Sequence, residues 1–208
     1  MKDIIGIISA GSVIIPVIFL FLFKKKDPVL IRPLSIYIYL CLVVEILNAV
    51  SIYLIGNTIA LGNIFNLLEL LIIGNIITTW IENIELKKYL IIILFIVSAF
   101  AFFYQLFYGF DHIVSELKIL FSIILITISF LYIATISDLF IAKNIGKTIF
   151  TIAVLFYFLS NSIIFSFSDY ILLKSHKQFW IFYAFIHALT NIIYNILIAI
   201  SLYKWKRN

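Results

Sequence analysis

Seven long apolar stretches run through this chain, and the charged residues gather in the short segments between them. Each stretch is close to the roughly 20 residues that an α-helix needs to cross the hydrocarbon core of a bilayer. Hydrophobic residues make up 64% of the 208 residues and charged residues only 12%, which is about half the charged share of a soluble domain. The sequence therefore predicts an all-α, polytopic membrane helix bundle with seven transmembrane helices, in which residues 1–208 form a single domain.

The polar segments set the limits of the seven spans. In chain order, the predicted spans are Ile4–Phe23, Pro33–Ile55, Thr58–Ile81, Tyr89–Phe110, Ile119–Ile136, Thr148–Phe167 and Phe179–Tyr203. The first apolar run is longer than the hydrophobic segment of a secretory signal peptide and ends in three lysines, so we expect it to be retained as a helix.

The positive charges are divided unequally between the two sides of the predicted bundle. An odd number of spans places the termini on opposite sides, and eleven of the 15 lysines and arginines fall on the side of the C-terminus. Because positively charged loops remain in the cytoplasm, this distribution predicts an outer N-terminus and an inner C-terminus. The abundance of Ile, Phe, Asn and Lys favours a bacterial chain, and we expect a multi-pass protein of the bacterial cytoplasmic (inner) membrane.

Several polar side chains lie inside the predicted spans. The most notable are two glutamates near the middle of the second and third spans, because a charged group at that depth costs about 2.5–3.5 kcal/mol even on lenient scales and is a functional-site hypothesis by default. The candidate substrate-binding or ion-binding residues are Glu45, Asn48, Asn66, Glu69, Asn161, His187 and Asn191.

These residues are expected to face one another. Hydrocarbon offers no hydrogen-bond partner, so polar helix faces should turn toward the bundle interior or a water-filled cavity. Their positions along the spans place them in one layer between the midplane and the outer leaflet, which predicts a cavity that opens outward. For the asparagines, hydrogen bonding between helices is favoured over a binding role, whereas for the glutamates a functional role is favoured.

Three functions fit such a layer. The first is transport or binding of a small polar solute or ion, with Glu45 and Glu69 as proton or cation sites. The second is a membrane sensor or accessory subunit that acts through a partner, because the loops are too short for an effector domain. The third is an intramembrane, metal-dependent lipid enzyme with Glu45, Glu69 and His187 as metal ligands.

The expected partners follow from these functions. They are the lipid bilayer, a small polar solute or cation, and a partner membrane protein or a second copy of the chain. Nucleic acid is not expected, since the lysines lie where topology places them. The chain has no HExxH, Walker or GxSxG motif and a single cysteine, Cys41, so no cofactor and no catalytic residue is predicted.

The scattered polar positions also form a recognisable pattern. It comprises Glu45, Asn57, Asn66-x-x-Glu69, Phe158-Leu159-Ser160-Asn161 and His187-x-x-x-Asn191-x-x-x-Asn195, and it ends at Trp205. This pattern resembles a group of small seven-span bacterial integral membrane proteins. That group has no assigned activity, so the resemblance implies a shared site without naming its function.

Two further expectations concern the architecture. Polar residues fall at comparable places in spans two and three and in spans six and seven, which predicts two parallel three-helix repeats joined by span four (a 3+1+3 pseudo-repeat). Such repeats are known in transporters, and the arrangement is loosely similar to sugar transporters of the SWEET type. Trp80, Trp180 and Trp205 lie near span ends and are expected to be anchors at the membrane interface.

Overall fold

The computed structural model of the chain describes residues 2–23, 28–111, 115–136, 142–166 and 177–207, and every regular element within these ranges is an α-helix. The helices are α1 (Lys2–Gly11), α2 (Ile14–Phe23), α3 (Pro28–Leu54), α4 (Ile59–Trp80), α5 (Ile84–Tyr108), α6 (Ser115–Thr135), α7 (Ala142–Ser166) and α9 (Lys177–Arg207). Counting α1 and α2 as one span, the described ranges contain seven helical segments that are long and apolar enough to cross a membrane. The prediction of an all-α bundle with seven such helices is confirmed.

Most helices extend beyond the predicted spans, because charged residues that were assigned to loops belong to helical turns. α5 begins at Ile84 rather than Tyr89, α6 at Ser115 rather than Ile119, and α7 at Ala142 rather than Thr148. Lysine and glutamate are good helix formers, so a helix can continue past its apolar segment into the polar interface. At the start of α5, the Asn83 side chain also accepts a hydrogen bond from the backbone N–H of Leu86 at 3.0 Å.

The first span is not the continuous helix that was expected. α1 ends at Gly11 and α2 begins at Ile14, and the carbonyl of Ser12 accepts from the backbone N–H of Ile15 at 3.0 Å. The cause lies at Pro16, which has no N–H and whose ring would collide with the carbonyl four residues earlier, that of Ser12. The span Ile5–Leu22 is therefore broken near its middle.

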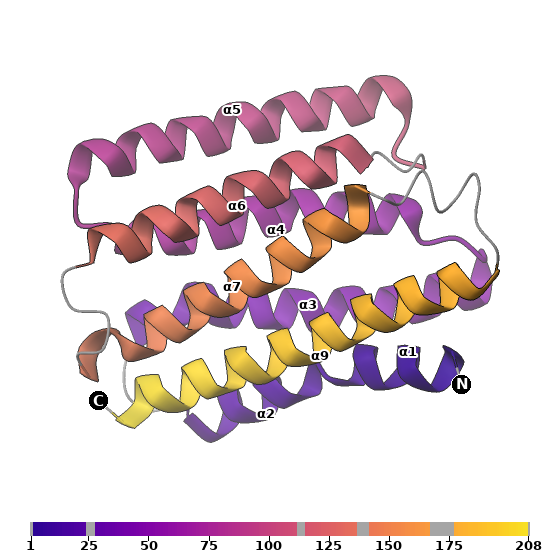
Figure 1. Ribbon diagram of the computed structural model, residues 1–208, viewed down its shortest axis with the longest axis horizontal. Helices are drawn as coiled ribbons and strands as arrows, with labels where there is room; N and C mark the ends of the chain where they lie inside the picture. Colours follow the sequence, from indigo (N-terminus) through magenta and orange to yellow (C-terminus); the bar gives the residue numbers. More distant parts are fainter. Residues whose placement is uncertain (1, 24–27, 112–114, 137–141, 167–176, 208) are drawn as a thin grey trace.

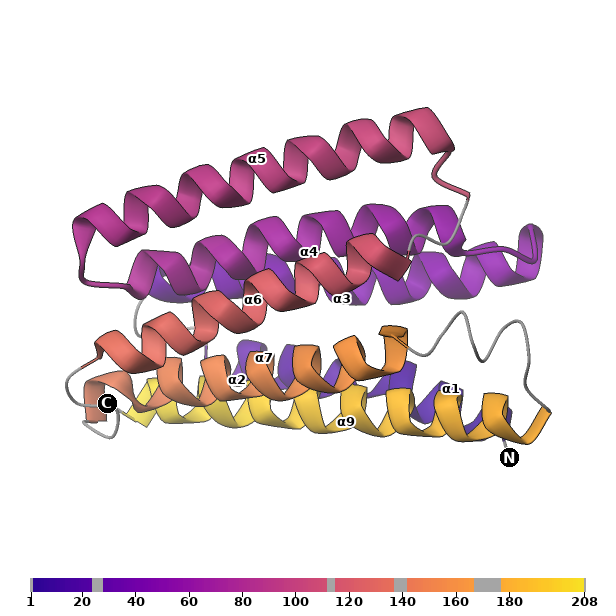
Figure 2. The same ribbon diagram turned by 45° about the horizontal axis from the view of Figure 1, so that its top comes forward.

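The helices run side by side, with the N-terminus at one end of the bundle and the C-terminus at the other (Figure 1). Turned by 45°, α3, α4 and α5 lie on one side, and α7 and α9 lie on the other with α1 and α2 against α9 (Figure 2). α6 crosses between the two groups and packs on both α4 and α7. A cavity lies between these two groups.

An aromatic cluster fills the bundle at the end where the C-terminus lies. The Trp80 ring lies edge-on to Trp205, Phe150 and Tyr132, with centroid distances of 5.4, 5.6 and 5.9 Å. Trp80 and Trp205 are partly exposed and also pack on the core, and their expected role as interfacial anchors stays a prediction. The side chain of Trp180 lies outside the described residues. The four rings come from α4, α6, α7 and α9 and hold these helices together at this end.

Beside this cluster, α7 and α9 approach closely at Gly146. The Ser201 hydroxyl donates to the Gly146 carbonyl at 2.8 Å, and a Cβ at position 146 would lie 3.1 Å from Cγ of Trp205 and 3.2 Å from the Ser201 carbonyl. The absence of a side chain is what permits this contact, as is common between helices in membranes.

We expect Gly146→Leu to lower the free energy of unfolding by about 1–3 kcal/mol, the range for overpacked cores. Gly6→Leu is the matched control, because no atom lies within 4 Å of a Cβ there. Unfolding of both variants in detergent, followed by tryptophan fluorescence, measures the difference. Equal stability of the two variants would contradict the close packing of α7 on α9.

Candidate functional site

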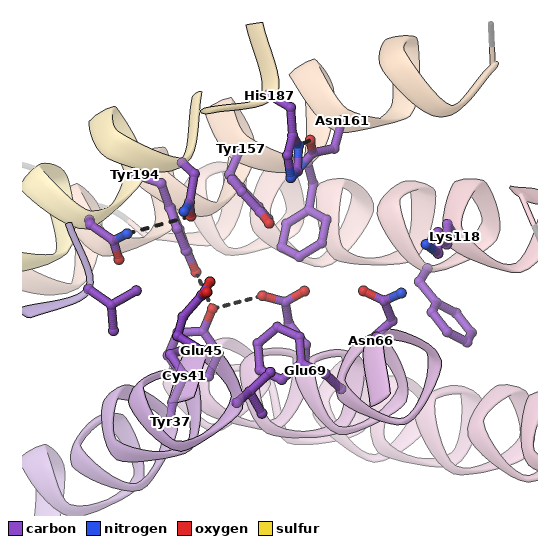
Figure 3. A pocket seen from close by; sticks show the side chains of 18 of the residues that line it. Tyr37, Cys41, Glu45, Asn66, Glu69, Lys118, Tyr157, Asn161, His187 and Tyr194 are labelled. Carbon is purple, nitrogen blue, oxygen red and sulfur yellow. Dashed lines mark hydrogen bonds between the residues drawn. The ribbon is translucent and has the colours of Figure 1, made fainter. Parts of the chain in front are cut away.

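A cavity of about 370 Å³ lies between α3 and α4 on one side and α6, α7 and α9 on the other. The seven residues selected from the sequence all line it: Glu45, Asn48, Asn66, Glu69, Asn161, His187 and Asn191. In Figure 3, the side chains of Glu45, Glu69 and Asn66 point across the cavity toward residues of α7 and α9. Helices that are distant in sequence therefore direct their polar faces into one space.

Helical periodicity explains why these side chains share the cavity. On α3, Tyr37, Cys41, Glu45 and Asn48 follow one another at intervals of four, four and three residues, which places them on one face. The opposite face of α3 carries Ile36, Val43 and Ile46, all exposed large apolar side chains. A helix with these two faces in a bilayer must turn the polar one inward.

A chain of hydrogen bonds joins the two walls at Glu69. Tyr37 of α3 donates its hydroxyl to Oε1 of Glu69 on α4 at 2.8 Å, and it lies 3.1 Å from the hydroxyl of Tyr194 on α9. Because the single proton of Tyr37 goes to the carboxylate, Tyr194 is the donor in the second bond. Glu69 is only 4% exposed, so these bonds lie in a low-dielectric environment and are strong ones.

Next to this chain, two tyrosine rings form part of the facing wall. The rings of Tyr157 on α7 and Tyr194 on α9 are stacked, with centroids 4.4 Å apart and planes 21° apart. Both residues line the cavity, as do Phe65, Phe121 and Phe158. The cavity is therefore lined by both polar and aromatic side chains.

His187 is held by Asn161. Its Nδ1 lies 3.0 Å from Oδ1 of Asn161, and since an amide oxygen can only accept, Nδ1 carries the proton. In a neutral ring, Nε2 is then a hydrogen-bond acceptor. The pair joins α7 to α9 at the cavity wall.

The two asparagines further along α9 bind the broken first span. Asn191 donates to the hydroxyl of Ser9 at 3.1 Å, and Asn195 donates to the hydroxyl of Ser12 at 2.8 Å. These bonds hold the polar groups next to the break between α1 and α2. Asn191 lines the cavity, but its amide nitrogen is committed to a contact between helices, in agreement with the interpretation favoured for the asparagines.

Three cavity residues carry polar groups that are not satisfied by the chain. Within the described ranges, Glu45 and Asn66 make no hydrogen bond or ion pair, and Oδ1 of Asn48 is buried with no partner. A buried acceptor with nothing to accept from is costly. The three unbonded side chains all belong to α3 and α4, whereas His187, Asn191 and Asn195 of α9 are hydrogen-bonded.

The predicted metal centre is not formed. Among the residues that the structure describes, no three His, Cys, Asp or Glu side chains are grouped so that they could hold one ion. Glu45, Glu69 and His187 share the cavity without converging on a point, because two of them lie on one wall and the histidine is bonded on the other.

Tyr37 and Lys118 also line the cavity, although neither was among the candidates. Tyr37 lies two helical turns before Glu45 on the same face, so its spacing was a usable signal. Lys118 was assigned to a loop, whereas it is the fourth residue of α6. The apolar run that follows it, which includes Phe121 at the next turn, was the signal that this lysine lies on a helix.

No family model, no curated protein and no solved structure matches this chain. The resemblance to small seven-span bacterial membrane proteins therefore stays a prediction. The function has to be argued from the cavity itself.

The single cysteine provides a direct probe of this cavity. Cys41 lines it and is half-buried, so we expect a membrane-impermeant methanethiosulfonate reagent to label it in reconstituted protein. Gly62 also lines the cavity, and no atom lies within 4 Å of the place that a Cβ would take there, so Gly62→Leu should fill space without strain and slow labelling at least tenfold. Gly6→Leu is the control, and labelling of Gly62→Leu at the wild-type rate would show that the reagent does not travel through the cavity.

Proposed function

We propose that this protein binds and transports a small polar solute or ion through the cavity between α3–α4 and α6–α7–α9. The observation that carries the proposal is the placement of two glutamates on a polar face at mid-helix depth, around one cavity. Glu69 lies ten residues after the start of α4 and eleven before its end. A bundle that needed only to be stable would have no use for a carboxylate at this depth.

The two ends of the bundle differ in a way that suits transport. The cavity reaches Gly62 and Lys118, which both lie within the first four residues of their helices, at the end that also carries the N-terminus. The opposite end is filled by the aromatic cluster around Trp80. A cavity that extends toward one end of the bundle, with packed aromatic side chains at the other end, matches the arrangement expected for one state of an alternating-access protein.

The membrane orientation is part of the proposal. Eleven of 15 lysines and arginines favour an inner C-terminus, in the cytoplasmic membrane of a bacterium. With that orientation the cavity is reached from outside. Labelling of Cys41 by an impermeant reagent added to whole cells rather than to inverted vesicles would support it, and the reverse preference would overturn it.

The 3+1+3 pseudo-repeat also remains a proposal. Its support is reciprocal packing: the first span packs on α9, and α6, its counterpart in the second repeat, packs on α4. The counterparts differ in one respect, since α6 packs extensively on α7 whereas α2 touches α3 only slightly. We infer that α3, which carries Glu45, is the more loosely held of the helices that line the cavity.

Reconstitution into liposomes tests the function. Vesicles with wild-type protein and with Gly62→Leu are exposed to gradients of small amines, amino acids, polyols and monovalent salts, and flux is followed by vesicle swelling and by current on a solid-supported membrane. We expect at least one solute class to cross with the wild-type chain and to be slowed at least tenfold by the filled cavity. Identical fluxes for both proteins across the whole panel would refute transport through this space.

A further inference from the structure

The two glutamates of the cavity lack a positive partner. One oxygen of Glu69 accepts from Tyr37, and Glu45 accepts no hydrogen bond within the described ranges. Neither carboxylate has an ion-pair partner among the described residues. Glu69 is 4% exposed and Glu45 is half-buried. Because a charge withdrawn from water is disfavoured unless it is paired, these two carboxylates favour a cavity ligand that carries a positive charge.

A second group on the same wall calls for a hydrogen-bond donor. Asn48 lies one helical turn beyond Glu45 on α3, and its Oδ1 is buried without a partner. The only groups that can satisfy such an oxygen are donors or cations. The carboxylates therefore indicate a positive ligand, and the Asn48 amide oxygen would accept from an N–H group of that ligand once the side chain turns into the cavity.

The opposite wall restricts the size and character of that cation. Tyr157 and Tyr194, whose rings are stacked on each other, point with their hydroxyl ends toward the glutamates across the cavity (Figure 3), and Phe158 also lines the cavity. Aromatic faces attract ammonium groups, and most strongly where water is excluded. A cavity of about 370 Å³ lies in the size range of small-molecule sites, and no grouping of three acidic, His or Cys ligands serves a bare metal ion in the described residues.

We propose that the cavity takes a small organic cation, a protonated or quaternary amine, whose ammonium group lies between Glu45 and Glu69 with the Tyr157–Tyr194 pair against its carbon groups. The inference rests on the proposed function and specifies its substrate class. Lys118 does not conflict with it, because this lysine lies at the far end of the cavity from Glu45, beyond Asn66 (Figure 3).

Thermal unfolding of the purified full-length chain tests the proposal. Probes are added at equal concentration to protein in a sodium chloride background: methylammonium, tetramethylammonium, potassium, glycine and glycerol. A ligand at about one hundred times its dissociation constant should raise the melting temperature by about 5 °C. We expect this rise for one or both amines, and a rise of less than about 1 °C for the other three probes. Potassium has no carbon groups, glycerol has no charge, and the carboxylate of glycine is repelled by the two glutamates.

Two variants test whether the amine-dependent rise in melting temperature requires the carboxylate of Glu45. Glu45→Gln removes a charge that makes no bond within the described chain, so it should fold normally and lose the amine-dependent rise. Glu85→Gln removes an exposed carboxylate in the first turn of α5 and should retain the full rise. An unchanged rise in Glu45→Gln would overturn the assignment of the ammonium to this site.

The outcomes separate the two proposals. A larger rise with glycine, glycerol or potassium than with either amine would overturn the organic cation while leaving a solute-binding cavity in place. No rise with any probe, together with no flux for any solute class in liposomes, would overturn both.

Discussion

A chain in which Glu69 is replaced with glutamine is expected to be at least as stable as the wild type. Its uptake of the proposed organic cation into liposomes should be about 100-fold lower. The amide keeps an oxygen that can accept from Tyr37, so the hydrogen-bond chain across α3, α4 and α9 can survive. What disappears is the negative charge. The loss of one close charge contact in a site of low dielectric constant is worth about 3 kcal/mol, which corresponds to about two orders of magnitude in affinity.

Stability should move in the opposite direction from activity. The Glu69 carboxylate is 4% exposed and has no ion-pair partner in the described part of the chain, so its charge opposes folding in the absence of a ligand. Glutamine removes that cost. A variant that is more stable and less active is the mark of a residue retained for function rather than for the fold.

The measurement combines flux in liposomes with the melting temperature of the same preparation. Glu85→Gln, which changes an exposed carboxylate outside the cavity, is the control and should leave both quantities unchanged. Tyr37→Phe should reduce uptake less than Glu69→Gln, because it removes one hydrogen bond but no charge. If the melting temperature of Glu69→Gln falls and uptake falls only with the folded fraction, Glu69 is a structural residue.

The second large effect is expected at Phe150. Its side chain is 0% exposed and lies edge-on to Trp80, which in turn contacts Trp205 and Tyr132. Phe150→Ala should cost about 3 kcal/mol, at the low end of the range for buried aromatic truncations. The low end applies because lipid solvates apolar side chains as well as the core does, so the loss reflects packing and the cavity left behind.

The same variant should also weaken the seal at the C-terminal end. Cys41 is then expected to react with an impermeant thiol reagent from that side as well, where the wild-type chain should be protected. Phe130→Ala is the matched control, since that ring on α6 is 55% exposed and its removal should change stability by less than about 0.5 kcal/mol. Stability of Phe150→Ala equal to that of Phe130→Ala would show that the aromatic cluster does not hold the helices together.

The polar positions within the spans could be selected from the sequence because the bilayer admits few alternatives for them. Glu45, Glu69 and His187 had to turn away from hydrocarbon, and a seven-helix bundle offers little interior space in which they can do so. Their common cavity is thus a consequence of solvation and helical periodicity, both of which are local properties of the chain.

The roles of those residues could not be read in the same way. Asn191 and Asn195 had the spacing of a binding face, yet their partners are Ser9 and Ser12, which lie 182 and 183 positions earlier in the chain. Lys118 was placed in a loop because its charge outweighed the apolar residues that follow it. For the two asparagines the deciding factor is which helix lies opposite, and no local pattern contains that information. For Lys118 a local signal existed in the apolar run that follows it.

The sequence by itself determined the seven spans, the separation of the termini to opposite ends and the set of polar groups that must face inward, because each follows from the free energy of placing a residue in oil or in water. Only the tertiary structure decided that Trp80 and Trp205 pack together, that Asn195 of α9 binds Ser12 at the break in the first span, and that Tyr37 links Glu69 to Tyr194 across the bundle. These contacts depend on which helices are neighbours, and in a membrane that choice is made by close packing and hydrogen bonds between distant segments.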